Sequence, residues 1–165
     1  IESYQNAMRI DSLNLDAHAN LGMLYLTQGD AQRAIEYQNA ALLIDPHFAL
    51  ALSNKGVIYG SRGYLKESIA AFQEAIEAKP TYVSAYYNLG KTYLHMKNYQ
   101  SAEQSFKNAL KYDPRHIGSY VDICTVYLHN NDWDNIERWG REGLKYKPDN
   151  PVLIGLVRQA QKHLP

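Results

Sequence analysis

The sequence predicts an all-α solenoid built from copies of one unit of 34 residues. Three observations predict it: small and aromatic residues recur at this single spacing, turn-forming residues stand at a fixed place inside each unit, and a proline stands at its end. A repeat of this length is typical of a supersecondary unit stacked on copies of itself. The recurring columns are Gly22, Gly56 and Gly90; Tyr25, Tyr59, Tyr93 and Tyr127; Ala7, Ala41, Ala75 and Ala109; and Pro46, Pro80, Pro114 and Pro148.

Taken in order, residues 1–14 are predicted to form one helix that ends near residues 10–12. Four complete units follow at 15–48, 49–82, 83–116 and 117–150, and residues 151–164 form a closing helix, so that 1–165 is a single array. Tyr4 and Ala7 lie 34 residues before Gln38 and Ala41, which makes the first helix the second half of a truncated unit. The chain is therefore expected to be a fragment of a longer protein.

Each unit needs two helices, and local sequence predicts where each helix stops. Residues that tolerate a left-handed backbone favour a turn inside each unit. Proline ends the second helix because it lacks the helical N–H and disfavours helix in the residue before it. Asn150-Pro151 begins the closing helix with a capping side chain and a proline in the first turn. The predicted turns are Gly29-Asp30, Gly63-Tyr64, Lys97-Asn98 and Asn131-Asp132.

The repeated columns predict how the helices pack. Glycine inside a helix costs about 1 kcal/mol relative to alanine, so its recurrence on first helices predicts that a neighbouring backbone comes close there. Ala34 and Ala102 are expected to serve the same close approach on second helices, and the tyrosine column to fill the spaces between. The last unit departs from the pattern, as terminal repeats commonly do. There Cys124 replaces the glycine, Ile136 the small residue, and Gly140 and Gly143 stand where Phe106 and Ala109 stood.

These columns resemble a known family. Asn20-Leu21-Gly22 with Tyr25, Gly29-Asp30, Ala34, Ala41 and Pro46 resembles the tetratricopeptide repeat, and Asn88-Leu89-Gly90 with Tyr93, Ala102, Phe106, Ala109 and Pro114 resembles it again. The resemblance covers the whole chain. It implies helix pairs stacked into a right-handed superhelix that binds protein or peptide partners and is not an enzyme.

Composition excludes several other classes. Lys plus Arg equals Asp plus Glu, 17 each, so no overall field favours nucleic acid. The apolar runs are far shorter than the roughly 18 residues of a membrane span. A single cysteine, Cys124, allows no intrachain disulfide or cysteine-based zinc site, and it is expected to act as a small hydrophobe. No phosphate-binding loop follows a strand, so no cofactor is predicted. The compartment stays open, with the cytoplasm as the default expectation.

The first helices carry the candidate recognition surface. One column consists of Asn20, Asn54, Asn88 and Asp122, and a side-chain amide both donates and accepts, so a ladder of amides can pair with the backbone of an extended peptide. In proteins that resemble the superhelix of the O-linked N-acetylglucosamine transferase, such a ladder holds the substrate chain. The alternative is that these amides bond to neighbouring helices or face water. Neighbouring columns add Met23, Tyr87, Lys91 and His95 to the predicted peptide-binding wall.

Two further features leave alternatives open. His95 and His129 share a column, but a metal site needs about three ligands that converge on one point, so peptide-facing or exposed histidines are expected. In the closing helix Val152, Ile154 and Val157 either pack on residues 135–147 or mediate self-association or contact with a partner. The functional hypotheses are a peptide-binding scaffold, the docking arm of a larger enzyme such as a glycosyltransferase, and a self-associating scaffold.

Overall fold

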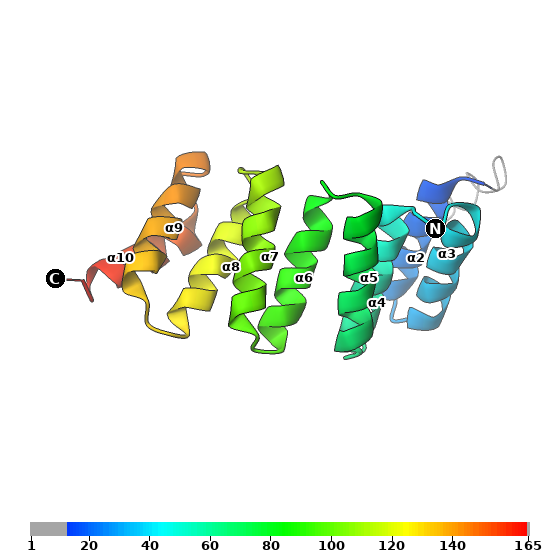
Figure 1. Cartoon of the computed structure of the whole chain (residues 1–165), viewed down its shortest axis with the longest axis horizontal. Helices are drawn as coiled ribbons and strands as arrows, with labels where there is room; N and C mark the ends of the chain where they lie inside the picture. Colours follow the sequence, from blue (N-terminus) through cyan, green and yellow to red (C-terminus); the bar gives the residue numbers. More distant parts are fainter. Residues whose placement is uncertain (1–12, 165) are drawn as a thin grey trace. The chain divides into compact units, whose positions relative to one another are not determined.

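The computed structural model describes residues 13–164, which form nine α-helices and no strand (Figure 1). The predicted helix over residues 1–14 falls almost wholly outside the described residues, and Leu13 and Asn14 precede the first described helix without being helical. The predicted all-α class is therefore confirmed. The helices are α2 (Leu15–Thr27), α3 (Ala31–Ile44), α4 (Ala49–Ser61), α5 (Leu65–Ala78), α6 (Val83–His95), α7 (Tyr99–Tyr112), α8 (Ile117–Leu128), α9 (Trp133–Tyr146) and α10 (Pro151–Gln161).

The turns inside the repeats lie where the sequence predicts them. Each contains one residue with a left-handed backbone: Gly29 at φ 83°, Gly63 at φ 78°, Lys97 at φ 58° and Asn131 at φ 53°. The next residue usually caps the second helix, because a side-chain oxygen of Asp30, Asn98 or Asp132 accepts from the N–H three residues further on. Tyr64 occupies the same position without a side-chain cap bond. Two of these four turns thus place a residue with a side chain in the region that glycine enters most easily.

The second helices end immediately before the recurring prolines. Asp45, Lys79, Asp113 and Lys147 all leave the helix with φ between −133° and −141° and positive ψ. This is the backbone that a following proline favours, because its ring clashes with a helical residue before it. Asn150 caps α10 by accepting from Leu153 N–H at 2.9 Å, with Pro151 in the first turn. The predicted start of the closing helix is confirmed.

The chain divides into two compact units, residues 1–88 and 89–165, with the boundary inside α6. In unit 1, α2 packs on α3 and α4, α3 on α4, and α4 on α5. Its buried clusters are Leu21, Tyr25, Ala34 and Ile58, and Leu52, Ala75 and Ala85. In unit 2, α7 packs on α8, α8 on α9, and α10 on both α8 and α9; the large, fully buried side chains include Phe106, Ile123, Ile136 and Leu153. The continuity of one array from residue 1 to 165 stays a prediction.

The glycine column marks tight contacts, but their nature differs from the prediction. A Cβ at Gly22 would lie 2.9 Å from the Ala34 carbonyl oxygen, so a neighbouring backbone does come close there. At Gly56 and Gly90 a close contact exists, but the prediction that its partner is backbone is wrong. A Cβ at Gly56 would lie 2.6 Å from the ring of Phe72, and one at Gly90 would lie 2.5 Å from the ring of Phe106. The absent side chain makes room for an aromatic ring rather than for backbone.

The departures of the last repeat are explained by α10. A Cβ at Gly140 would lie 2.5 Å from Val157 Cγ2, and one at Gly143 would lie 2.7 Å from Leu153 Cδ1. Side chains of the closing helix therefore occupy the space that Phe106 and Ala109 fill one repeat earlier. Val157 is buried, whereas Val152 is 50% exposed. Of the alternatives left open for the closing helix, packing on residues 135–147 is the one that the structure shows.

Candidate peptide-binding surface

Each first helix presents one stripe of four residues spaced i, i+4, i+7 and i+11, which lie on one face of a helix. We call it the first-helix stripe. In unit 1 it contains the exposed Asn20 and the half-buried Met23. Tyr87 was predicted on the same wall, but it stands in the neighbouring column with Ala19 and Ser53, which are both buried. The stripe residues are Asp16, Asn20, Met23 and Thr27 on α2, and Leu50, Asn54, Val57 and Ser61 on α4.

Asn54 is the buried member of the stripe, with 8% of its surface exposed. Its Nδ2 lies 3.3 Å from Gln38 Oε1 and 3.4 Å from the Ala19 carbonyl oxygen. Gln38 Nε2 donates to the same Ala19 oxygen at 2.9 Å. These three groups, the amide network, join α2, α3 and α4. Asn54 therefore donates to neighbouring helices, which is the alternative that the sequence left open for the amide column.

The remaining predicted contact residues lie on α6 and α8. Tyr87 and Asn88 in unit 1 are half-buried. In unit 2, Lys91 and His95 are exposed and Asp122 is half-buried. The stripe of unit 2 thus carries ionisable groups of both signs, whereas polar uncharged and apolar side chains dominate on α2 and α4 of unit 1.

The histidine column has a third member, His163, which lies 34 residues after His129 and was not among the predicted residues. His129 stacks on Tyr99 with ring centroids 4.4 Å apart, and His163 stacks on Trp133 at 4.1 Å. The two pairs have the same sequence offset of 30, so each histidine packs on the aromatic residue that opens the preceding second helix. Among residues 13–164, no group of three or more His, Cys, Asp or Glu side chains is placed to hold a metal ion.

An ionic cluster joins α7, α8 and α9 of unit 2. The Tyr127 hydroxyl donates to Glu103 Oε1 at 2.6 Å, and Lys107 Nζ donates to the same carboxylate. Burial acts to raise the pKa of Glu103, but the bonds from Lys107 and Tyr127 outweigh it and the pKa is lowered. Burial and the bond to Glu103 raise the pKa of Tyr127 to about 12. Lys107 Nζ also lies 5.6 Å from the centre of the Trp139 ring.

Cys124 is fully buried, and its Sγ lies 3.6 Å from the Ile136 carbonyl oxygen. Burial raises the pKa of this thiol to about 12. Since the thiolate is the nucleophilic form of cysteine, this burial disfavours the reactive form of Cys124. The prediction that it acts as a small hydrophobe is confirmed.

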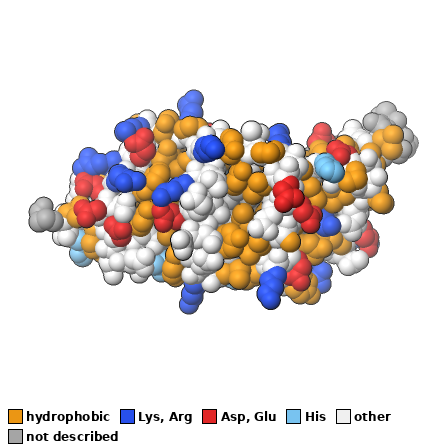
Figure 2. Space-filling model, viewed as in Figure 1, with side chains coloured by type: hydrophobic (Ala, Val, Ile, Leu, Met, Phe, Trp, Pro, Cys, Tyr) orange, Lys and Arg blue, Asp and Glu red, His pale blue; other side chains and the backbone are white. Residues whose placement is uncertain are grey.

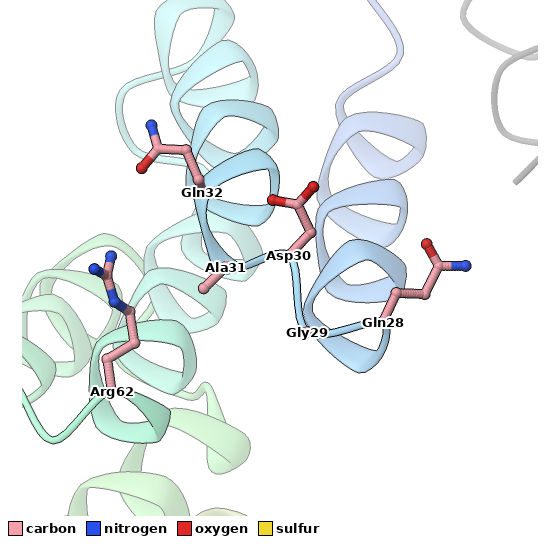
Figure 3. Close-up of a pocket in the computed structure, with 6 residues that line it drawn as sticks. All are labelled: Gln28, Gly29, Asp30, Ala31, Gln32 and Arg62. Atoms are coloured by element: carbon pink, nitrogen blue, oxygen red, sulfur yellow. The ribbon is translucent and has the colours of Figure 1, made fainter.

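A polar cavity of about 420 Å³ lies beside the turn between α2 and α3 and is lined by Gln28, Gly29, Asp30, Ala31, Gln32 and Arg62 (Figure 3). Its two charged side chains already have partners. Asp30 caps α3 and lies 3.3 Å from Arg33 Nε, and the Arg62 guanidinium lies 5.0 Å from the centre of the Tyr64 ring.

Figure 2 shows charged side chains of both signs scattered among apolar ones on the face that it draws.

Three family models match the chain. Two models described as tetratricopeptide repeat match residues 15–48 and 83–116, and one described as TPR repeat matches residues 56–97. The chain belongs to the tetratricopeptide repeat family. The bounds 15–48 and 83–116 are the same as those of the first and third repeats predicted from the sequence. Comparison with curated protein sequences gives no significant match.

Solved tetratricopeptide structures share the fold. The hetero-tetramer Cut9–Hcn1 of APC/C contains a chain 23% identical, with a TM-score of 0.82 over 97% of this chain. The chain spans only 32% of that protein's length. YrrB, described as a TPR protein with an unusual peptide-binding site, is 15% identical with a TM-score of 0.73, covering 97% of this chain and 82% of YrrB. Pseudomonas aeruginosa pilF is 21% identical with a TM-score of 0.82, covering 97% and 73%.

Tetratricopeptide arrays are protein–protein interaction scaffolds, and this chain has their repeat and their fold. No helix among the described residues has both the length and the apolar character needed to cross a membrane.

Proposed function

We propose that the chain is a non-enzymatic scaffold that binds an extended protein segment along the first-helix stripe. The proposal rests on Asn20, whose side chain is exposed on α2. The next two residues, Leu21 and Gly22, are buried against neighbouring helices. An exposed amide can donate to and accept from the backbone of any extended peptide. The description of YrrB as a TPR protein with a peptide-binding site supports the same class of ligand.

In unit 1, Asn20 supplies polar contacts and Met23 supplies an apolar one. Methionine adapts its flexible thioether chain to side chains of different shape, which suits a groove that reads backbone more than sequence. We assign Asn54 a supporting role, because its amide N–H groups point toward Gln38 and Ala19. It fixes α4 against α2 and so sets the spacing of the residues that touch the ligand.

Asn88 on the stripe of α6 completes the proposed surface of unit 1, with the half-buried Tyr87 beside it in the neighbouring column. Unit 2 carries Lys91, His95 and Asp122 on its own stripe. We propose that these three ionisable residues select polar or charged side chains of a segment bound to unit 2. The opposite signs of Lys91 and Asp122 favour a ligand with mixed charge over a strongly acidic or basic one.

The test begins with selection of binding peptides from a displayed library of unstructured sequences, followed by titration of one synthetic peptide. Asn20→Ala and Asn88→Ala should each remove about 0.5–1.5 kcal/mol of binding free energy. The double variant should bind roughly fivefold to a hundredfold more weakly, since about 1.4 kcal/mol is a factor of ten.

Asn39→Ala is the matched control, because Asn39 is also an exposed asparagine but lies on the second helix α3. It should leave the affinity unchanged. Normal binding by the double variant together with weakened binding by Asn39→Ala would move the site to the second helices. Circular dichroism of each variant confirms that the helices are retained.

A further inference from the structure

Unit 1 carries a groove at the ends of its repeats, where second helices give way to the next first helix, and it shares only Asp16 and Leu50 with the first-helix stripe. Two adjoining cavities form it, of about 460 and 320 Å³, and both are lined by His47 and Ala78. The α3–α4 connection contributes Asp45 and Phe48, and the end of α5 contributes Glu74 and Glu77. The groove thus draws on elements from two successive repeats of unit 1.

The floor of the groove is apolar. Phe48, Ala49, Leu50 and Ala78 are buried or half-buried, and the half-buried ring of Tyr82 closes one side. Phe48 stands at the N-cap of α4, where no side-chain bond is made. A residue that forgoes a capping bond at this position costs helix stability relative to Ser, Thr, Asp or Asn. Phe48 therefore gives the groove an aromatic wall at the expense of a cap.

The rim of the groove is acidic. Asp16, Asp45, Glu74 and Glu77 line the two cavities, and none of the ion pairs among the described residues includes any of them. Asp45 Oδ1 accepts from His47 N–H at 2.9 Å, which leaves its second oxygen for another donor. Lys79 also lines the groove, and its Nζ lies 5.7 Å from the centre of the Tyr82 ring. The cation that lines the groove therefore rests on an aromatic face.

The charge of the two units supports a cationic ligand. Residues 1–88 contain six Lys and Arg against nine Asp and Glu, a formal net charge of −3 with histidine neutral, while the whole chain is neutral. Like charges gathered around a low-dielectric wall strengthen the field at a cleft and attract ligands of the opposite sign.

We propose that this groove is a second binding site, for a basic peptide segment in which Arg or Lys side chains flank an apolar one. The apolar side chain lies on Phe48 and Ala78, and the cations meet the carboxylates of the rim. Arginine suits it best, because its planar fork bonds carboxylates bidentately and stacks on aromatic rings. The site lies at the helix ends, so a segment bound there leaves Asn20 and Met23 of the first-helix stripe open for another ligand.

The probe is a short capped synthetic peptide in which arginines alternate with leucines. Two control peptides replace the arginines by glutamates or the leucines by glycines. Binding is followed by fluorescence anisotropy and localised by NMR, with the His47 ring as a reporter in the groove. The arginine–leucine peptide should shift His47 and the amides near residues 45–49 and 78–82, and both control peptides should bind more weakly.

The variant D16N/E74Q/E77Q keeps side-chain shape and removes three negative charges from the rim, and should weaken binding about tenfold. The variant E36Q/E67Q/D134N removes three exposed carboxylates elsewhere and should change affinity much less. Equal weakening by both variants, or no saturable binding of the arginine–leucine peptide, would overturn the proposal. So would a protein that self-associates in solution and becomes monomeric in D16N/E74Q/E77Q, since a second copy would then be the occupant.

Discussion

Units 1 and 2 both connect three consecutive helices through polar side chains, but they do so with different chemistry. In unit 1 the amide network of Gln38, Asn54 and the Ala19 carbonyl joins α2, α3 and α4, and it is neutral and buried. In unit 2, Glu103 and Tyr127 join α7 and α8 through an ionised carboxylate near the surface, and Lys107 extends the cluster to the Trp139 ring of α9. A repeat fold thus fixes the packing of neighbouring helices either by shared amides or by a charged hydrogen bond.

The same contrast appears in the column opposite the repeated glycine. Phe72 and Phe106 fill it with a ring, Gln38 fills it with an amide, and Gly140 leaves it to Val157 of α10. Each solution occupies a similar space with different partners. The residues opposite the glycine column therefore differ in chemistry, while the space between the helices stays filled, as expected for a close-packed interior.

The largest effect is expected where a ring fills the column. Phe72→Ala in unit 1 and Phe106→Ala in unit 2 should each lower the free energy of unfolding by about 3–5 kcal/mol, because a large buried side chain is replaced by a cavity. Chemical denaturation followed by circular dichroism measures the loss. Leu43→Ala is the control, since Leu43 is 86% exposed. Similar losses for Leu43→Ala and Phe72→Ala would contradict the assigned packing.

How far the sequence predicts this structure depends on whether the determinant is local. The turn at Lys97-Asn98 and the helix ends before the prolines follow from backbone preferences of adjacent residues, and all were predicted. The burial of Asn54 depends on Gln38, which lies 16 residues away on another helix. Gly22 opens the space for the Gln38 amide, since a Cβ there would lie 2.2 Å from Gln38 Nε2. Gly22, Gln38 and Asn54 stand in three different repeat columns, and no single column shows that they meet. The sequence therefore predicted the helix face of the amide column, but not which of its members are exposed and which are buried.

Filling the space at Gly140 should have the next largest effect. Gly140→Ala places a methyl group against Val157 Cγ2 and should cost about 1–3 kcal/mol by overpacking. The double variant Gly140→Ala/Val157→Ala restores the volume and should recover part of that loss. Thermal unfolding of wild type, of Gly140→Ala and Val157→Ala alone, and of the double variant tests this. An additive cost in the double variant would mean that α10 does not occupy the space beside Gly140.

The amide network of unit 1 can be broken at one partner or at both. Gln38→Leu leaves the Asn54 amide and the Ala19 carbonyl without the glutamine, and should cost about 1–3 kcal/mol of stability. Replacing both partners by apolar residues of similar shape can be nearly neutral, so Gln38→Leu/Asn54→Leu should be more stable than the single variant. Urea denaturation of the single and double variants provides the coupling energy. A coupling near zero would mean that the two amides act independently.

The smallest expected effect concerns the ionic cluster of unit 2, and pH separates it from the neutral network of unit 1. Because the pKa of Glu103 is lowered in the folded state, its stabilisation is fully present above the unfolded pKa and is lost as pH falls through the folded one. Glu103→Gln should therefore lower stability at pH 7 by about 1 kcal/mol or less, the usual size near the surface. The difference from wild type should shrink once pH falls below the unfolded glutamate pKa, and it should vanish below the lowered folded one. Urea midpoints of wild type and Glu103→Gln at pH 7 and pH 3 measure this difference.

Gln38→Leu is the control, since no carboxylate takes part in its network and its cost in stability should be the same at both pH values. A cost of Glu103→Gln that does not change with pH would show that Glu103 acts through packing and not through its charge.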